Sequence, residues 1–354
     1  MAILRAVVVG GGTGGMLSAR ALLASPRFEL VAVADTSAAA IERLSQEASL
    51  AGAELFPDYQ SMFSATAADV VCVSTYAPTH EEIAMAAMDL PAKGLLVEKP
   101  LAGTVAAGQR IVGAAKARQL PIVVPHGLMA RDAPREVLSE LRSGAIGALR
   151  VVEMECTGWD LINAGIHWIQ YFVALSGTDL PERVLCACDT STRTFRDGLQ
   201  VETEAITLVT CAGGVRLVLH TGDQVPLAQE GAACLMRIVG DRGYIEYGAW
   251  LDHYRVVAPG RPDRSVEVPP SEVSGHRRHL EHLADLIETR TVDYEVADTS
   301  LLALEIIEAA YLSNRVRASV TLPLSSFAAA GPPDWDPGSP YSGRGGGRDG
   351  RQLP

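Results

Sequence analysis

The sequence predicts an α/β protein in which an N-terminal doubly wound parallel sheet is followed by an α+β domain with a large, mainly antiparallel sheet. In residues 1–126, short apolar runs alternate with helical segments, a pattern typical of parallel strands covered by helices. In residues 127–328, longer alternating runs follow one another across short turns that contain Gly or Asp, which indicates antiparallel strands. The chain is long enough for two domains, each with its own core.

The runs of the first domain are continuously apolar, as expected for strands that are buried on both faces. The expected strands are 3–9, 28–34, 54–56, 69–75, 94–98 and 121–125, and the expected helices include 14–25, 37–51, 79–89 and 103–119. Alternation of this kind predicts right-handed crossovers in a parallel sheet with helices on its faces.

The second domain is predicted from residue 127 onward, where the pattern changes. The expected strands are 148–157, 182–195, 202–211, 215–222, 232–239, 243–248 and 252–258, with helices at 132–143, 161–176, 275–290 and 298–317. The final segment, 329–354, is so rich in Gly, Pro and Arg that it forms no packed element alone. We expect either a solvated tail or an arm that reaches a neighbouring subunit or the site.

Composition excludes several classes of function. A net charge of −12 argues against a nucleic-acid partner, because phosphate binding needs a basic face. The start of the sequence lacks the features of a signal peptide, and no apolar stretch approaches a membrane span, so we expect no membrane partner and a cytoplasmic location. Six cysteines without paired Cys-x-x-Cys spacing indicate reduced thiols. His276, His279 and His282 step by three along a helix and do not converge, so we expect a solvated helix face and no metal.

A glycine-rich loop predicts a dinucleotide site. Gly10, Gly12 and Gly15 follow the first strand and open a helix, whose free N–H groups would face a pyrophosphate. Asp35 ends the second strand, where its carboxylate can accept hydrogen bonds from ribose hydroxyls and would repel a 2′-phosphate. This favours NAD over NADP. Alternatively, Asp35 only caps the helix that begins near Ser37.

Lys99 is the main candidate for chemistry. It follows the apolar strand 94–98 and precedes Pro100, so it would lie at the carboxyl end of a parallel strand, where ligands bind in doubly wound sheets. A lysine amine in such a site can take or donate a proton. His126, after the sixth strand, is a weaker candidate for the substrate pocket.

The order of these motifs resembles the Gfo/Idh/MocA family of sugar and cyclitol dehydrogenases over nearly the whole chain. The residues that carry the resemblance are the glycine loop, Asp35, Pro78-Thr79-His80, Glu98-Lys99-Pro100, Asn163-Ala164-Gly165-Ile166-His167, Gly240-x-x-Gly243 and the helix around 304–311. The Glu-Lys-Pro segment in this setting is fairly specific, whereas the glycine loop alone is not.

The resemblance implies a catalytic set of Lys99, His167 and Asn163, with Lys99 close to the nicotinamide. Asn163 and Gln170 replace acids that members of the family usually carry, so we expect a mainly neutral His167 and a larger share of proton transfer for Lys99. His167 could instead be a core histidine of an aromatic-rich helix. The expected cofactor-binding residues are Gly10, Gly12, Thr13, Gly15, Asp35, Thr75, His80, Glu98 and Lys99.

The expected function is NAD-dependent hydride transfer at a secondary alcohol or ketone of a sugar, sugar derivative or cyclitol. Two alternatives stay open: an NAD-dependent glycosidase that works by transient oxidation and elimination, and a non-catalytic NAD-binding sensor. The partner of the site would be a small polyhydroxylated molecule. A sheet face free to pair with a second copy favours a homodimer or homotetramer.

Overall fold

The computed structural model describes residues 3–50, 52–189 and 194–324 and divides the chain into two compact units. The first unit comprises Met1–His126 and Val273–Leu301, and the second comprises Gly127–Glu272 and Leu302–Pro354. The predicted tail, 329–354, lies outside the described residues.

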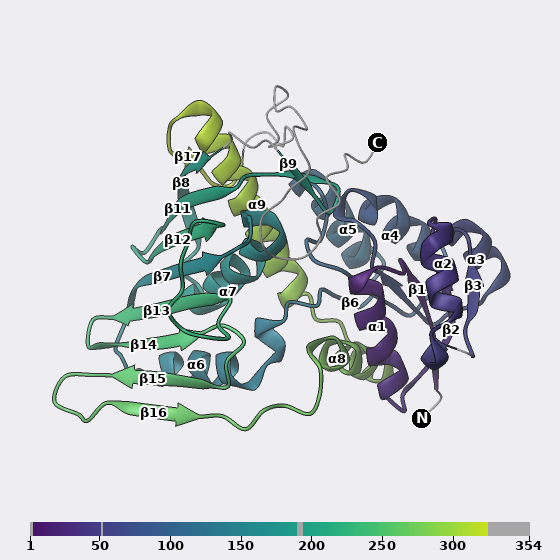
Figure 1. The fold of residues 1–354 in the computed structure, drawn as a ribbon, viewed down its shortest axis with the longest axis horizontal. Helices are drawn as coiled ribbons and strands as arrows, with labels where there is room; N and C mark the ends of the chain where they lie inside the picture. The colour runs from purple at the N-terminus through teal and green to yellow at the C-terminus, as the bar shows by residue number, and fades with distance from the viewer. Residues whose placement is uncertain (1–2, 51, 190–193, 325–354) are drawn as a thin grey trace. The chain divides into compact units, whose positions relative to one another are not determined.

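The first unit is built on a six-stranded parallel sheet with the order β3-β2-β1-β4-β5-β6 (Figure 1). All six strands were predicted, and every residue of β4 and β5 is buried, which explains their unbroken apolar sequence. The order reverses between β1 and β4, which creates the switch point at which such folds bind ligands. The strands are β1 Leu4–Val9, β2 Phe28–Ala34, β3 Glu54–Phe56, β4 Val70–Val73, β5 Gly94–Val97 and β6 Ile122–Val123.

Helices α2, α3 and α5 of the first unit begin at polar capping residues. Ser37 and Thr104 accept backbone hydrogen bonds at the starts of α2 and α5, and Asp58 does so at α3, a helix that the sequence did not predict. The predicted helix 37–51 is shorter and ends in a 3₁₀ turn. The helices are α1 Thr13–Ala24, α2 Ala38–Ser45, α3 Tyr59–Ala65, α4 His80–Met88 and α5 Val105–Ala117, with 3₁₀ turns η1 Ala48–Leu50 and η2 Ala77–Thr79.

A helix from late in the sequence completes the first unit. Helix α8 (Gly275–Thr289) lies beside α1 (Figure 1), and its Leu280 and Leu283 join the buried core of the parallel sheet. It approaches β5 so closely that a Cβ on Gly94 would lie 2.8 Å from a methyl carbon of Leu283. The sequence had assigned this helix to the second domain. The structure corrects that assignment, because the apolar face of α8 is buried on the first sheet.

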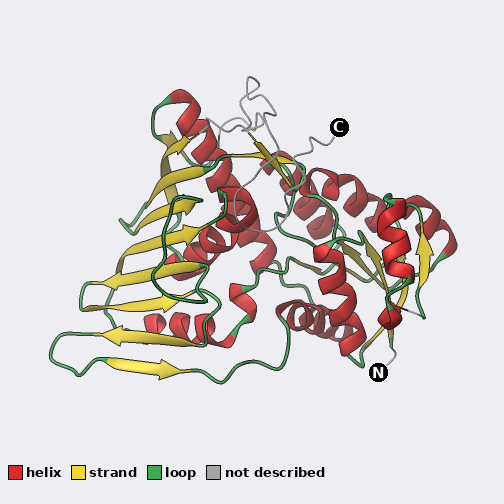
Figure 2. Cartoon of the chain, in the orientation of Figure 1, coloured by secondary structure: helices red, strands yellow, loops and turns green. Residues whose placement is uncertain are grey.

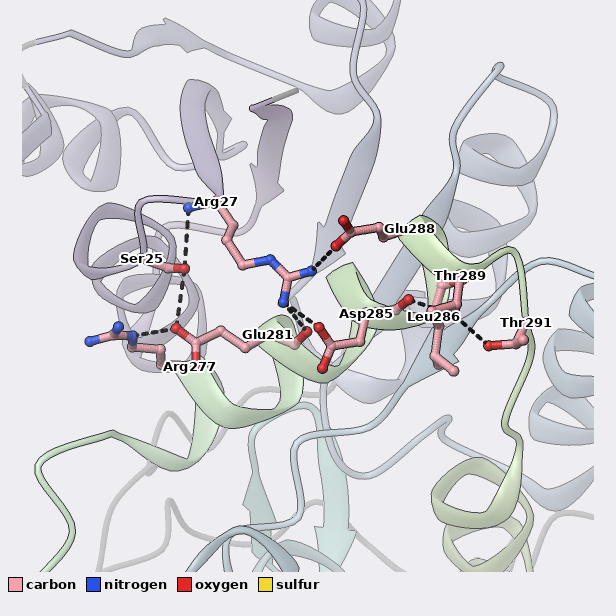
Figure 3. Close-up of polar contacts among 9 residues, drawn as sticks. All are labelled: Ser25, Arg27, Arg277, Glu281, Asp285, Leu286, Glu288, Thr289 and Thr291. Carbon is pink, nitrogen blue, oxygen red and sulfur yellow. Dashed lines mark hydrogen bonds and ion pairs between the residues drawn. The ribbon is translucent and has the colours of Figure 1, made fainter. Parts of the chain in front are cut away.

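Arg27 fixes α8 from the loop before β2 (Figure 3). Its guanidinium pairs with Asp285 at 2.5 Å and with Glu288 at 3.2 Å, and it donates to the carbonyl oxygen of Glu281 at 3.0 Å. The Ser25 hydroxyl reaches the Glu281 carboxylate at 3.3 Å. Residues about 260 positions apart in sequence are thereby held together.

The second unit contains a nine-stranded sheet with the order β16-β15-β14-β13-β7-β12-β11-β8-β17, visible as the yellow strands of Figure 2. The sequence predicted a mainly antiparallel sheet, and the sheet is antiparallel except where β7 pairs with β12. The predicted strand 182–195 is divided into β8 and β9, and β10, β16 and β17 were not predicted. The strands are β7 Leu149–Thr157, β8 Pro181–Asp189, β11 Glu204–Cys211, β12 Arg216–Gly222, β13 Cys234–Gly240, β14 Gly243–Gly248, β15 His253–Val257, β16 Arg264–Glu267 and β17 Val320–Thr321, with a separate hairpin of β9 Thr194–Arg196 and β10 Leu199–Val201.

The apolar helix of the second unit is α7 (Ile166–Ser176), which is preceded by a π-helical turn, η4 (Leu161–Gly165). The side chains of Trp168 and Tyr171 are fully buried, and each donates a hydrogen bond, to Cys156 Sγ at 2.9 Å and to the Pro134 carbonyl oxygen at 2.7 Å. The sequence predicted one continuous helix over 161–176. The remaining helices are α6 Asp132–Arg142 and α9 Glu295–Val316, and η3 Leu128–Ala130 is a 3₁₀ turn.

Candidate active site

The glycine loop has the shape that a dinucleotide requires. Gly10 has a φ of +107°, and a Cβ on it would lie 2.3 Å from the Ser74 carbonyl oxygen. A Cβ on Gly15 would lie 1.7 Å from the Gly10 carbonyl oxygen, so side chains are excluded at both positions. Gly12 and Thr13 are exposed at the start of α1, where no side chain caps the helix. These features fit a pyrophosphate bound by backbone N–H groups.

Asp35 lies against this loop and does not cap α2. Its carboxylate accepts the Gly11 N–H at 2.7 Å and the Ser37 N–H at 2.7 Å, while Ser37 itself caps the helix. A carboxylate has about four acceptor positions, so these two bonds leave capacity for ribose hydroxyls. The alternative role of Asp35 as a simple helix cap is therefore wrong.

Arg43 contacts the glycine loop, and the sequence did not predict this contact. Its guanidinium donates to the Gly11 carbonyl oxygen at 2.9 Å, so Gly11 is held on one side by Asp35 and on the other by Arg43. The sequence offered no guanidinium close to Asp35 along the chain. The only available signal was the spacing that places Arg43 one and a half helical turns after Ser37.

Lys99 is half-buried at the carboxyl end of β5, next to a buried ion pair. Glu98 accepts the Lys99 backbone N–H at 3.1 Å, and its other oxygen lies 2.5 Å from Nε2 of His276 on α8. Burial by itself would raise the pKa of the Glu98 carboxyl. The hydrogen bond and charge of His276 and the charge of Lys99 outweigh burial, so the pKa is lowered. Glu98 is therefore an anion at neutral pH.

The three histidines of α8 are not all solvated, which corrects the sequence interpretation. His276 bonds Glu98, as described, and His279 is buried and donates from Nε2 to the His126 carbonyl oxygen at 3.1 Å. His282 is the most exposed of the three, with a side chain that is 44% exposed and lies 3.5 Å from Asp293. Among the residues that the structure describes, no group of three or more His, Cys, Asp or Glu is placed to hold a metal ion.

His80 and Thr75 belong to the loop after β4. His80 was predicted to bind the cofactor, but its ring is fully buried and its nitrogens lie 2.9 Å from the Thr75 carbonyl oxygen and 3.3 Å from that of Leu101. Burial lowers its pKa. These contacts hold this loop against the segment after Lys99, and cofactor binding by His80 stays a prediction. Thr75 is half-buried, and its hydroxyl bonds that of Thr79 at 2.8 Å.

His126 is a buried structural residue and not a pocket residue. Its Nε2 lies 2.9 Å from the Ser300 hydroxyl, and its carbonyl oxygen accepts from His279. Burial and the neighbouring charges lower the pKa of His126 to about 3 and that of His279 to about 4. Both rings are therefore neutral at physiological pH.

In the second unit, His167 differs from its neighbours on α7. It is half-buried, whereas Trp168, Gln170 and Tyr171 are fully buried. The imidazole lies 5.9 Å from the ring of Trp250, edge to face. Its partial exposure disfavours the alternative of a core histidine. Gln170, in contrast, lies in the core.

Asn163, on the π-helical turn, is held by a carboxylate that the sequence analysis overlooked. Asp160 accepts from the Asn163 backbone N–H at 2.8 Å and from its Nδ2 at 3.1 Å. Asp160 also pairs with Arg196 at 2.8 Å, and both side chains are fully buried. The acid expected at position 163 is thus replaced by an amide that is bonded to an acid three residues earlier.

Glu202 extends this buried cluster. It accepts from the Leu161 backbone N–H at 2.7 Å and from the Tyr311 hydroxyl at 2.7 Å. Burial and the negative charge of Asp160 raise the pKa of the Glu202 carboxyl to about 7. The buried side chains of Asp160, Arg196 and Glu202 therefore support the turn that carries Asn163.

Comparisons with known proteins agree with this architecture. The model of the Gfo/Idh/MocA oxidoreductase family, with its NAD-binding Rossmann fold, matches residues 4–126. An inositol 2-dehydrogenase of Acidothermus cellulolyticus is 36% identical over 147 residues, which cover 41% of this chain and 42% of that relative, less than half its length.

Solved structures resemble the chain over most of its length. An oxidoreductase domain protein from Kribbella flavida has a TM-score of 0.80 at 18% identity and covers 92% of this chain and 100% of its own. An oxidoreductase from Agrobacterium radiobacter, solved with NAD+, L-tartaric acid and magnesium, has a TM-score of 0.78 at 16% identity and covers 90% of this chain and 98% of its own. At these identities the likeness is one of fold.

The parallel sheet, the glycine loop and the family match define residues 4–126 as an NAD-binding Rossmann fold. Residues 4–126 match the model of the Gfo/Idh/MocA family, in agreement with the resemblance that the motifs of this segment carry. No helix within the described ranges is both long and apolar enough to cross a membrane.

Proposed function

We propose that the protein is an NAD-dependent dehydrogenase that acts at a secondary hydroxyl of a sugar, sugar derivative or cyclitol. The observation that carries this proposal is Lys99, half-buried at the carboxyl end of β5 in an NAD-binding domain and adjacent to the ionised Glu98. The inositol 2-dehydrogenase relative supports a polyhydroxylated substrate.

The proposal assigns one role to each residue of the site. The backbone of Gly12 and Thr13 holds the pyrophosphate, and Asp35 holds the ribose. When bound, NAD supplies the hydride acceptor. Once it has lost its own proton, Lys99 takes the hydroxyl proton of the substrate, since a neutral lysine amine can act as a general base. His167 and Asn163 bind substrate hydroxyls, with His167 mainly neutral.

The test is a screen of sugars, sugar acids and inositols, with NADH absorbance as the readout. We expect turnover with at least one cyclic polyol or sugar. Lys99→Met should lower kcat by about 10²- to 10⁴-fold, the usual loss for a general base, while NADH still binds. Undiminished turnover in this variant would contradict the role of Lys99.

The same screen, with glycosides added to the panel, separates the alternatives. A glycosidase that oxidises its sugar transiently would release the aglycone without net NADH. A non-catalytic sensor would bind NAD and a polyol and turn over neither. The presence of both Lys99 and His167 favours the dehydrogenase, since a sensor needs neither as a proton carrier.

We propose that NAD is preferred because Asp35 would repel a 2′-phosphate. Arg43, bonded to the same loop, offers a guanidinium that could pair with that phosphate once Asp35 is removed. Asp35→Ser should therefore raise the ratio of NADP to NAD use by about tenfold or more, and adding Arg43→Ala should reverse the gain. An unchanged ratio in Asp35→Ser would argue against this.

We also propose that the protein pairs with a second copy through the nine-stranded sheet. Leu185, Leu208 and Val218 stand opposite one another on three adjacent strands, and all three are exposed. An apolar row of this kind can meet its own copy across a two-fold axis. Leu208→Lys should yield monomers in light scattering, and an unchanged mass would exclude this face.

A further inference from the structure

Trp250 has an unusual backbone for a bulky side chain. Its φ is +74°, in the left-handed region that Gly or Asn occupies at lower cost. It follows β14 in the second unit, and its side chain is only partly buried. A large residue that is kept in a strained conformation indicates that its side chain is needed there, which points to function.

The surroundings of Trp250 hold it in this conformation. Arg131 donates to the Trp250 carbonyl oxygen at 3.0 Å and pairs with Asp252 at 2.8 Å, so it ties together residues on either side of Leu251. The indole also lies against the backbone of Gly127, where a Cβ would come within 2.7 Å of the ring. The position of the ring is therefore fixed by the fold.

The ring of Trp250 borders the candidate catalytic histidine. It lies 5.9 Å from the His167 imidazole, at an interplanar angle of 83°, and 5.6 Å from the ring of Trp168. Trp168 is 1% exposed and belongs to the core, so its role is packing. Trp250 is the outer member of this aromatic group, beside the residue proposed to bind a substrate hydroxyl.

We propose that Trp250 binds the apolar C–H face of a six-membered ring, of a cyclic polyol or a pyranose, while His167 meets a hydroxyl at the ring's edge. This inference rests on the proposed function and narrows its substrate class. Rigid aromatic surfaces bind apolar faces well, and a few polar groups then fix orientation. An acyclic polyol presents no such face.

The test measures wild type, Trp250→Ala and Trp250→Phe with two substrates. These are myo-inositol and sorbitol, an acyclic polyol with the same number of hydroxyl groups. Trp250→Ala should raise KM for myo-inositol by about tenfold, and Trp250→Phe by much less. KM for any sorbitol turnover should change less than twofold. Tyr244→Ala, on the strand that precedes Trp250, is the matched control, since Tyr244 stacks on Arg237 at 4.4 Å and has no proposed role in the site.

Two further measurements distinguish a failure of this inference from a failure of the proposed function. Binding of myo-inositol and of glucose, followed by isothermal titration calorimetry, does not require turnover, and NADH binding tests whether the first unit is intact. Wild type that binds a cyclic ligand without oxidising any substrate would refute the proposed dehydrogenase and leave the Trp250 contact supported if Trp250→Ala loses that binding. An unchanged cyclic-ligand affinity in Trp250→Ala, an equal loss for cyclic and acyclic ligands, or no cyclic ligand bound by wild type would overturn the inference.

Discussion

Glu98 in the first unit and Glu202 in the second are both almost fully buried, yet their pKa values move in opposite directions. Glu98 accepts a hydrogen bond from His276 and lies next to the charge of Lys99, and its pKa is lowered. Glu202 faces the negative charge of Asp160, and its pKa rises to about 7. The contrast teaches that the sign of the neighbouring charge decides the protonation of a buried carboxyl when burial is equal.

The largest expected effect comes from removing the cation of the second cluster. Arg196→Met would leave Asp160 buried without its ion pair, so we expect a loss of about 3–5 kcal/mol in unfolding free energy. Arg150→Met is the matched control, because the Arg150–Asp241 pair is exposed and should contribute about 0–1 kcal/mol. Denaturant unfolding measures both. Equal losses of unfolding free energy in the two variants would mean that burial of an ion pair does not affect its contribution to stability.

The buried histidines of the first unit should make its stability depend on pH. The pKa values of His126 and His279, about 3 and about 4, lie below the usual value near 6.5 for an unfolded chain. Between pH 6.5 and 4 the unfolded state binds more protons, so stability falls as pH falls, by up to about 2 kcal/mol per histidine at pH 5. His279→Gln should remove part of this slope. A slope unchanged in that variant would contradict the assignment.

A smaller loss is expected when the Glu98 pair is broken. His276→Leu removes the partner of a buried carboxylate and should cost about 2 kcal/mol at pH 7, whereas His276→Gln keeps a donor and should cost less. Because the folded pKa of Glu98 is lowered, its contribution is present above the unfolded value and lost as pH falls through the folded one. The difference between wild type and His276→Leu should therefore shrink toward pH 4. If kcat of His276→Leu falls although the variant stays folded under the assay conditions, His276 also positions Lys99.

The last effect should have the opposite pH dependence. The pKa of Glu202 is raised, so the folded state binds more protons between about pH 4.5 and 7, and stability is lost as pH rises through that window. Glu202→Gln should remove this loss and gain at least about 1 kcal/mol at pH 8 relative to pH 5. Thermal unfolding at the two pH values measures it. A gain that is equal at both pH values would mean that Glu202 does not titrate there.

The sequence predicted what local pattern determines. The six parallel strands follow from continuous apolar runs, and Gly10, Gly15 and Asp35 follow from spacing along one βαβ unit. Short strands such as β17, which has two residues, carry too little periodicity to be recognised. Where the signal is local and long enough, the prediction holds.

The contacts around the site were not predictable in the same way. His276 and Glu98 are 178 positions apart, and the pattern of α8 does not say on which sheet its face is buried. Histidines among arginines resemble a solvated face until the packing is known. Asp160 was overlooked because its partner Arg196 comes from a separate short hairpin. Such pairings depend on tertiary structure, which spacing along the chain does not encode.

The return of α8 to the first sheet has a practical consequence for engineering. A chimaera that exchanges residues 1–126 for those of a relative would keep this chain's α8 over the new sheet, where Leu283 would lose Gly94 and Asp285 would lose Arg27 as its partner. The unit that can be exchanged is therefore discontinuous. Junctions after His126, before Val273 and after Leu301 would transfer the cofactor domain together with the helix that covers it.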